Sequence, residues 1–487
     1  MDNQKLTQLI LEQWRPSPII KDMREADKYY RGENTAISKK QRGYTNPKTK
    51  KFEQINTVSN EKLFSGFIRQ SVNQKVAYGF GKPFVLSVDK LDESVSDDLK
   101  DRYATEWGNF ITPYFRKQLK SIAREAINNG IGWGFVYIDP NDELLKVDNY
   151  KSETLYPKWI DDSHKNFDAL VRDYIEQVYT DDGIESVNKV ELWTENEVEK
   201  YIADGLDLEP DTSSGESVST HLNNQQGWGK IPFIFLKSSD DEMPLLKLIK
   251  SYIDGYDELN SKSIDSLIDD IEPIMVLKGM SAELHDLTEA KELLNQLKVT
   301  AVEENGDVSY LQAKIDIDNV QKKLENIKKD IKEFSCTVNT QDIQFGSNPS
   351  GIALKAAYQD LDIYMNDIET EFELFMQQLK YFFDKYQVFK GNFTEAELKQ
   401  LDITVTLDRD MMLNETELIE NTAKLSGLVS QETLDGYNPA VESHEIEQKR
   451  RDNEEDDRLN KSNPYNFGNE PDTEPEPDEE NTETQGE

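Results

Sequence analysis

The spacing of apolar side chains along the chain predicts three long amphipathic helices. Residues 243–272 carry apolar side chains at steps of three and four until Pro273, which ends the helix. The same spacing covers residues 316–338. A third run, residues 351–391, alternates between steps of four and three, and so regular a seam favours packing against another helix. Because its methionines and aromatic rings are also typical of ordinary core, we expect this stripe to be core.

Residues 60–242 show a different pattern, in which short alternating stretches typical of strands follow helical ones. One helix is predicted to end at the glycine turn "GFGK" and to lead into a strand around Leu86. A second helix, over residues 97–128, is predicted to lead into a strand at Trp133. Strands and turns then alternate as far as "IPFIFL". This mixture predicts one α+β domain.

Shorter elements are predicted around these. Residues 273–315, between the first two long helices, indicate a β-α-β-β module with Asn305-Gly306 as its hairpin turn. The module is too small to be expected to fold alone. A helical arm that ends in a lysine-rich loop, a late strand and two short helices complete the pattern, over residues 1–59, 392–412 and 413–460.

A polar stretch, "NTQDIQFGSNPS" at residues 339–350, separates the second and third long helices. Asn348 can cap the helix that follows and Pro349 can take its first position, so the break ends in a helix start. Connections between helices usually need about two to eight residues. The stretch is therefore long for a plain connector, which is the simpler interpretation.

Composition and charge limit the classes of protein that fit. The chain has 487 residues, of which 10% are aromatic, and this is enough for real cores in several domains. Its net charge of −39 repels polyphosphate, which excludes a conventional tight DNA binder. From Asn469 onward the sequence holds acids and prolines but no base, and we expect residues 461–487 to be a disordered acidic tail.

Cysteine usage and the absence of targeting signals point to a reducing compartment. Cys336 is the only cysteine, which excludes an internal disulfide framework, and we expect it to be a small buried residue. The N-terminus lacks the basic start and long apolar run of a signal peptide, and no stretch reaches the roughly 18 apolar residues of a membrane span. We therefore expect a soluble protein with no membrane partner.

The motifs of common enzymes do not appear. "GFGKP" lacks the spacing and the hydroxyl of a phosphate-binding loop, and Pro83 prevents the helix that such a loop needs. Acid pairs such as the one at 240–241 are too common among 95 acids to indicate a metal or an acid-base pair. No metal-binding pair is formed in sequence by His164, His221, His285 and His444. We expect no enzyme, no cofactor and no metal.

The second long helix carries the densest basic group of this acidic chain. Its lysines alternate with acids, which is typical of a solvated helical face held by ion pairs between residues four apart. Composition alone favours that interpretation. The lysines are Lys322, Lys323, Lys328, Lys329 and Lys332.

Several strings occur along the chain in a specific order. They are "YYRGENTAI", "FIRQSVNQKVAYGFGKPFVLSV", the stretch from "GWGKIPFIFLKSSDD" to "IDSLIDD", "SGIALKAAYQDLD" and "LSGLVSQETL", and they extend from residue 29 to about residue 434. Each string is weak alone. In this order they resemble the portal proteins of tailed bacteriophages, in the branch that infects Gram-positive hosts.

The resemblance implies an elongated, mostly helical α+β subunit that assembles head to tail into a ring of about twelve copies. The polar stretch then matches the tunnel loop, which projects into the narrowest part of the channel. The implied regions are a wing over residues 60–242, 351–391 and 392–412, a stem over 243–272 and 316–338, a clip over 273–315, a tunnel loop over 339–350 and a crown over 413–460.

The resemblance also implies site residues. Rings of positive charge facing DNA would come from Lys322, Lys323 and Lys329. A polar, mostly uncharged loop can touch DNA without holding it. The tunnel-loop residues are Gln341, Asp342, Gln344, Phe345, Ser347 and Asn348. The clip residues expected to face partner proteins are Lys278, Glu283, Glu304 and Asn305.

The implied function is a channel at one capsid vertex, through which a separate terminase ATPase packages double-stranded DNA that is later ejected. Expected partners are further copies of the chain, DNA held weakly and without sequence preference, the terminase large subunit, a head-tail adaptor, and the major capsid and scaffold proteins. The expected location is the virion, after assembly in the host cytoplasm.

Two alternatives stay open. One is a non-channel helical scaffold or adaptor protein of a phage or prophage, whose long seam would pair with a second copy. The other is an enzyme whose site is assembled from loops and shows no motif.

Overall fold

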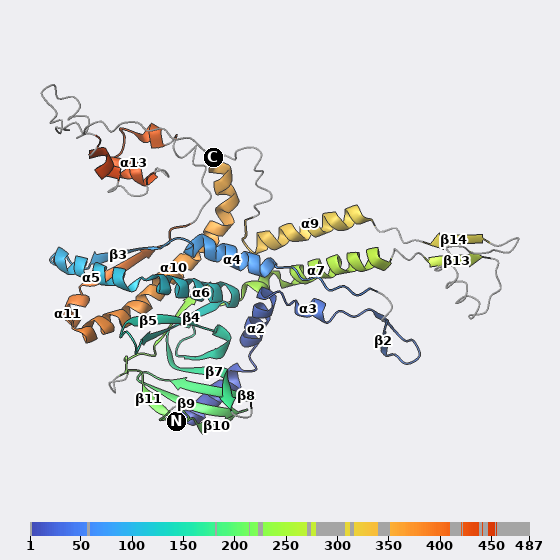
Figure 1. Cartoon of the computed structure of the whole chain (residues 1–487), viewed down its shortest axis with the longest axis horizontal. Coiled ribbons are helices and arrows are strands. Elements are labelled where there is room, and N and C mark those ends of the chain that lie inside the picture. Colours follow the sequence, from blue (N-terminus) through green and yellow to red (C-terminus); the bar gives the residue numbers. More distant parts are fainter. Residues whose placement is uncertain are drawn as a thin grey trace, which may run out of the picture. The chain divides into compact units, whose positions relative to one another are not determined.

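We describe the chain from a computed structural model (Figure 1). The structure describes residues 2–55, 59–180, 183–213, 215–222, 227–269, 274–278, 307–311, 316–338, 351–409, 420, 422–437, 441, 447–452 and 454. The chain divides into two compact units, one of Met1–Ile343 with Lys355–Met411 and one of Gln344–Leu354 with Met412–Glu487. The first unit mixes helices with antiparallel sheets, which confirms the predicted α+β class.

A three-stranded antiparallel sheet carries helix α6 (Pro113–Asn129). A Cβ atom on Gly132 of this sheet would lie 2.1 Å from the carbonyl oxygen of Ile122 in α6. Only glycine therefore lets the helix approach the strand so closely. The strands, in spatial order, are β12 (Phe233–Lys237), β4 (Ile131–Ile138) and β5 (Leu145–Tyr150).

A larger antiparallel sheet is covered by helix α1 (Asn3–Trp14). Trp14 stacks on Tyr156 of the sheet with ring centroids 6.1 Å apart, and Arg15 forms an ion pair with Asp173 at 2.8 Å. The start of the predicted arm is therefore part of this sheet's core. The strands, in spatial order, are β10 (Asp207–Pro210), β9 (Glu197–Asp204), β8 (Gly183–Trp193), β7 (Phe167–Thr180) and β6 (Leu155–Trp159), and β11 (Val218–Thr220) also pairs with β9.

Helix α10 (Gly351–Lys390) forms the centre of a second core. It packs on α4 (Phe67–Phe80), where Phe372 meets Phe80 at 5.6 Å between ring centroids. It also packs on α5 (Asp97–Phe110), where Phe383 stacks on Trp107 at 4.0 Å. The predicted stripe is buried along its length, at Leu361, Met365, Ile368, Phe372, Phe375, Leu379, Phe382 and Tyr386. The expectation that it is core is confirmed.

Strands from distant parts of the chain close this core. Strand β15 (Leu401–Thr406), which the sequence predicts, pairs antiparallel with β3 (Val85–Lys90). The short helix α11 (Glu395–Leu398) precedes β15, and Thr394 and Glu397 cap it reciprocally.

The helix predicted over residues 97–128 is wrong, because two helices occupy that stretch. Helix α5 ends at Phe110, and α6 starts at Pro113. The Thr112 hydroxyl accepts a hydrogen bond from the Phe115 amide at 3.3 Å, and Pro113 takes the first helical position. This threonine cap followed by proline restarts the helix, and it is the local signal that the apolar spacing hides.

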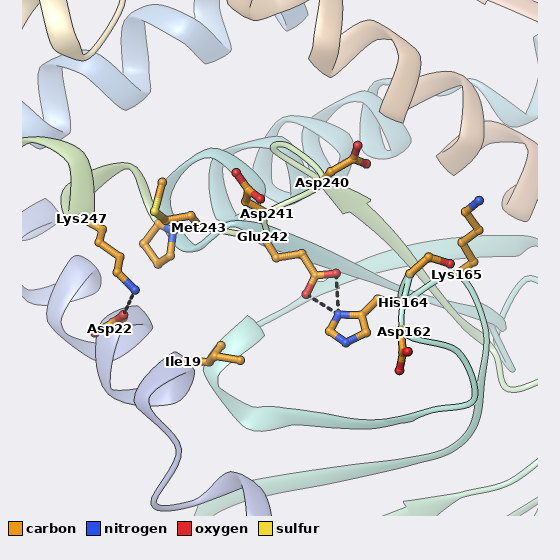
Figure 2. Close-up of a pocket in the computed structure, with 12 residues that line it drawn as sticks. Ile19, Asp22, Asp162, His164, Lys165, Asp240, Asp241, Glu242, Met243 and Lys247 are labelled. Atoms are coloured by element: carbon orange, nitrogen blue, oxygen red, sulfur yellow. Dashed lines mark hydrogen bonds and ion pairs between the residues drawn. The ribbon is translucent and has the colours of Figure 1, made fainter.

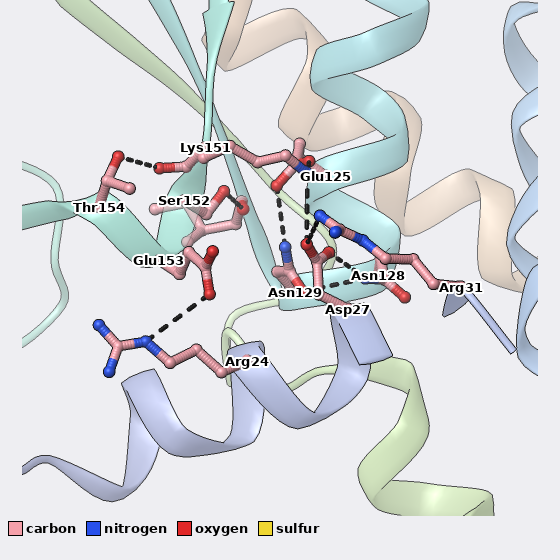
Figure 3. A network of polar contacts seen from close by, with 11 residues as sticks. Arg24, Asp27, Arg31, Glu125, Asn128, Asn129, Lys151, Ser152, Glu153 and Thr154 are labelled. Atoms are coloured by element: carbon pink, nitrogen blue, oxygen red, sulfur yellow. Dashed lines mark hydrogen bonds and ion pairs between the residues drawn. The ribbon is translucent and has the colours of Figure 1, made fainter. Parts of the chain in front are cut away.

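A polar network joins α2 (Pro18–Tyr30) to α6 and to the 3₁₀ turn Ser152–Thr154 (Figure 3). Lys151 lies 2.5 Å from Glu125 and 3.4 Å from Asp27, and both carboxylates are largely buried. Burial also raises the pKa of Glu153, which lies 3.7 Å from Arg24. Removing one member would leave a buried charge without compensation, so the network fixes α2 on α6.

Further elements complete the two units. Gly32 follows α2 with φ 86, a left-handed conformation that glycine adopts without strain after a helix. Strands β13 and β14 pair antiparallel, whereas the predicted helix and Asn305-Gly306 turn of that module lie outside the described residues. The elements are α3 (Thr35–Ser38), β1 (Gly43–Thr45), β2 (Phe52–Gln54), α7 (Leu245–Asp269), β13 (Ile274–Lys278), β14 (Asp307–Leu311) and α9 (Ile317–Phe334) in the first unit, and α13 (Gln431–Tyr437) in the second.

Among the helices of the described ranges, none combines the length and the apolar character needed to span a bilayer.

The contact of α6 with β4 yields a stability test. We expect Gly132→Ala to lower the melting temperature strongly or to make the chain insoluble, because the new methyl group meets the backbone of α6. The matched control is Gly108→Ala in α5, where a Cβ meets nothing within 4 Å. Alanine there should stabilise the helix by about 0.5–1 kcal/mol. Equal thermal unfolding of the two variants would contradict the packing.

Candidate functional site

Helices α7 and α9 lie side by side and form the frame of the candidate site (Figure 1). Tyr252, near the start of α7, meets Phe334 at the end of α9 with ring centroids 5.2 Å apart, so the pair is antiparallel. Ile253 and Ile331 are buried in the same core. The apolar faces predicted from spacing thus account for this contact.

The lysines of α9 differ in their surroundings. Lys322, Lys323 and Lys329 are exposed, and within the described part of the chain no ion pair holds them. Lys332, in contrast, is only 6% exposed. The interpretation of these three lysines as members of ion pairs four residues apart therefore finds no support on α9.

Helix α4 holds the residues that lead from α9 into the predicted tunnel loop. The side-chain amide of Gln74 accepts from the Val338 amide at 3.0 Å and donates to the Val338 carbonyl at 3.3 Å. Ser71 donates to Ser335 at 3.3 Å, and Ser335 lies 2.7 Å from the Thr337 hydroxyl. Because these groups are largely buried, the residues between α9 and the predicted loop are fixed to α4.

Lys75 lies at the centre of this junction and is fully buried. Its ammonium donates to the Cys336 carbonyl at 3.3 Å and lies 3.4 Å from the centroid of the Tyr364 ring of α10. No acid of the described residues pairs with it, and burial lowers the pKa of Lys75 to about 7. Cys336 is half-buried, with φ 48, rather than the buried residue that the sequence suggested.

A ladder of buried polar side chains on α7 holds the segment that follows α2. Asp257 accepts from Asn34 at 2.7 Å and from the Ser65 amide at 3.0 Å. Ser261 accepts from the Leu63 amide at 3.0 Å, and Asp265 pairs with Lys40. The sequence interpretation missed this ladder, whose signal is the spacing of Asp257, Ser261 and Asp265 at four-residue steps on one helix face.

A hollow of about 720 Å³ lies where α2, the turn before β7 and the start of α7 meet (Figure 2). The ring of His164 stacks on Trp159 at 4.7 Å, and its Nδ1 lies 3.0 Å from Glu242. Lys237 also pairs with Glu242, at 2.9 Å. In the ranges that the structure describes, no three histidine, cysteine or acidic side chains gather as metal ligands. These charges therefore satisfy one another.

Of the predicted clip and loop residues, one belongs to the described part of the chain. Lys278 is the last residue of β13. The others lie outside the described residues: Glu283, Glu304 and Asn305 of the predicted clip, and Gln341, Asp342, Gln344, Phe345, Ser347 and Asn348 of the predicted loop.

The burial of Lys75 predicts a pH dependence of stability. In the unfolded chain its pKa returns to the ordinary 10.5, so between about pH 7 and pH 10.5 the unfolded state binds more protons than the folded state. The free energy of unfolding contributed by Lys75 therefore rises with pH across that window. We expect the stability of the wild type relative to Lys75→Met, measured by urea denaturation, to increase from neutral to alkaline pH.

The matched control for that measurement is Lys62→Met, which changes an exposed lysine that donates to a backbone carbonyl. Its stability relative to the wild type should stay level over the same range. A level difference for Lys75→Met as well would show that Lys75 titrates as it does in water.

Known proteins resemble this chain over most of its length. A family model described as "Phage portal protein, SPP1 Gp6-like" matches residues 18–459. The portal protein of Bacillus phage SPP1 is 26% identical over 462 residues, which cover 91% of this chain and 84% of the relative. The portal protein of Clostridium phage phiCD119 is 24% identical over 408 residues, which cover 80% of this chain and 84% of the relative.

Among solved structures, a chain from the virion of a native gene transfer agent particle aligns with a TM-score of 0.43 at 10% identity, covering 88% of this chain and 97% of that chain. A score this low does not establish a shared fold. The family match, by contrast, contains every element from α2 to α13. The chain therefore belongs to the phage portal protein family, in its SPP1 Gp6-like branch.

Proposed function

We propose that this chain is the subunit of a portal ring, in which about twelve copies surround a channel at one capsid vertex. Double-stranded DNA passes through the channel, driven inward by a separate terminase ATPase and released later, and head-tail connector proteins dock on the ring. The subunit itself catalyses no reaction. The observation that carries this proposal is the family match over residues 18–459. The ring assembles in the host cytoplasm and remains in the virion.

In this proposal the antiparallel pair of α7 and α9 is the stem, and the module that contains β13 and β14 is the clip. The clip meets the terminase large subunit and later the head-tail adaptor, through residues that include Lys278, Glu283, Glu304 and Asn305. The sheets with α4, α5, α6 and α10 form the wing, and residues 413–460 form the crown. The major capsid and scaffold proteins surround the ring.

The exposed lysines of α9 are the proposed DNA-facing cations. Lys322 and Lys329 lie seven residues apart, on the side of α9 away from its apolar stripe. Lys323 lies about 100° around the helix from Lys322, at the edge of that stripe. In a ring of about twelve subunits, each of these lysines would occur about twelve times and form a ring of positive charge. Because exposed ammonium groups are screened by salt, such rings attract phosphates only weakly, which suits a polymer that must slide.

The junction on α4 suits a loop that works against a moving polymer. Gln74 and Ser71 hold Val338 and Ser335, directly before residues 339–350, so force on the proposed loop would reach a packed helix. We propose that the loop contacts DNA in the channel through Gln341, Asp342, Gln344, Phe345, Ser347 and Asn348.

The alternative of a scaffold or adaptor that pairs through a coiled coil lacks its main support. That alternative required the stripe of α10 to face a second copy. Leu361, Phe372 and Phe382 of that stripe are instead buried in the chain's own core, where Phe372 packs on Phe80 of α4.

The proposal predicts a large closed particle. Twelve copies of a 56.2 kDa chain make a ring of about 670 kDa with a central hole. Mass photometry, together with negative-stain images of the same purified sample, measures both properties. A compact dimer at all protein concentrations, with or without the cognate scaffold protein, would overturn the proposal.

The stem lysines predict a graded loss of DNA contact. Lys322→Gln, Lys323→Gln and Lys329→Gln together should leave the ring intact and lower its weak affinity for linear duplex DNA, with a shallower dependence on salt. Fluorescence anisotropy measures the affinity. The control changes three exposed lysines that already pair with acids, Lys158, Lys247 and Lys385. An equal loss in both variants would show that net charge alone controls binding.

A further inference from the structure

A pocket beside the first half of α6 is lined by cations. It has a volume of about 530 Å³ and opens between α6 and the turn "GFGKP" that leads to β3. We call its basic side chains the α6 cation row, which consists of Arg116, Lys117, Lys120 and Arg124 on α6 with Lys82 on the turn.

The cation row has few acidic partners, although acids outnumber bases by 95 to 56 in this chain. In the described ranges no carboxylate pairs with Arg116, Lys117 or Arg124. Lys120 donates to the Gly81 carbonyl at 3.1 Å, and Lys82 lies 3.9 Å from Asp408 at the edge. Exposed lysines elsewhere, such as Lys158, do pair with acids. The cations on α6 thus resemble Lys322, Lys323 and Lys329 of α9, which also have no acid partner among the described residues.

The placement of these cations is electrostatically unfavourable without an anion. Arg116, Lys120 and Arg124 follow one another at four-residue steps, where like charges repel. Arg116 and Lys117 lie near the start of α6, whose first turn holds no acid, and a helix N-terminus disfavours positive charge. A bound anion would offset both interactions, because it attracts the cations and is itself favoured at a helix N-terminus.

The floor of the pocket positions the charged groups. Phe80, Phe84, Leu119 and Leu407 line it, and Arg116 and Arg124 are half-buried. Their aliphatic stems can cover this apolar floor while the guanidinium groups reach the opening. Part of the side-chain ordering cost is thus met before any ligand binds.

The hydrogen-bonding character of the pocket indicates the ligand. The basic side chains offer donors only, and the Gly81 carbonyl already accepts from Lys120. A phosphodiester backbone carries acceptors only, whereas a polypeptide also brings amide donors that need acceptors. The cations along α6 are spaced by about 6 Å for every four residues, which makes a row suited to a linear polyanion.

We propose that the α6 cation row binds the phosphodiester backbone of duplex DNA, at a site on a different element from the stem lysines. The contact is independent of base sequence, because it reads phosphates alone. This inference rests on the proposed function, since it takes DNA as the polymer that the protein handles. It adds a DNA contact on the proposed wing to the one in the channel.

The test measures binding of a short fluorescein-labelled duplex by anisotropy over a salt series, with the full chain. The variant combines Arg116→Gln, Lys117→Gln and Arg124→Gln, which removes three cations and leaves no described acid without a partner. We expect the slope of log affinity against log salt to become shallower by about 2 to 3, and the low-salt affinity to fall roughly tenfold or more.

Two control variants test whether the charges of the cation row control binding. One keeps those charges, and the other changes the net charge of the chain elsewhere. Arg116→Lys with Arg124→Lys keeps the charges and should retain the slope. Glutamine at Lys158, Lys247 and Lys385 changes the net charge by the same amount at acid-paired positions and should change the slope little. Circular dichroism shows whether the triple variant folds. If it does not, the decisive measurement is whether inorganic pyrophosphate competes with the duplex for the wild type and for the stem-lysine variant.

The outcomes are distinct from those of the ring experiment. An unchanged slope in the folded triple variant, or no competition by pyrophosphate, overturns the cation row as a DNA site even if rings form. Loss of binding to a glutamate-rich peptide with unchanged DNA binding overturns it in favour of an acidic protein partner. A shallower slope in a chain that forms no ring supports the site and leaves the failure with the proposed ring.

Discussion

Burial of one face of α10 is the constraint on which the first unit depends. Rings and aliphatic side chains from α4, α5 and β15 converge on this face, and their burial supplies the dispersion and apolar contacts that hold the unit together. The same face is the most regular apolar pattern in the sequence. Its burial inside the chain favours a core helix over a coiled coil between two copies. Because this face is buried in the subunit's own core, it is not available to pair with a second copy in a coiled coil.

Helix α4 connects that core to the candidate site. On one side, Phe80 packs on Phe372, and a Cβ on Gly79 would lie 2.1 Å from the end of Met365. On another side, Gln74 and Lys75 hold the backbone of Val338 and Cys336. A shift of α4 on α10 would therefore move Cys336 and Val338, which directly precede the predicted tunnel loop. The position of the residues directly before the predicted loop therefore depends on core packing.

Local patterns allowed many of the helices and strands to be predicted. Contacts between residues far apart in the sequence could not be predicted from those patterns. Apolar spacing located α7, α9 and α10 because each pattern lies within one helix. Nothing local indicates that β3 pairs with β15, more than 300 residues later, or that Gln74 meets Val338. Of the candidate site, the exposure of the predicted lysines could be read from helical periodicity. The buried Lys75 could not, because a lysine beside an apolar stripe is usually at the surface.

A net charge of −39 and the proposed handling of DNA are compatible because charge acts over short distances in salt. At physiological ionic strength the Debye length is about 8 Å, so a phosphate responds to the nearest cluster rather than to the average of the chain. The acidic surroundings then keep DNA from adhering elsewhere. The flexible lysines of α9 and the half-buried arginines of α6 differ in how far they are ordered in advance. Transient contact with the lysines of α9 suits DNA that is moving, whereas the more ordered arginines of α6 suit DNA that is stationary.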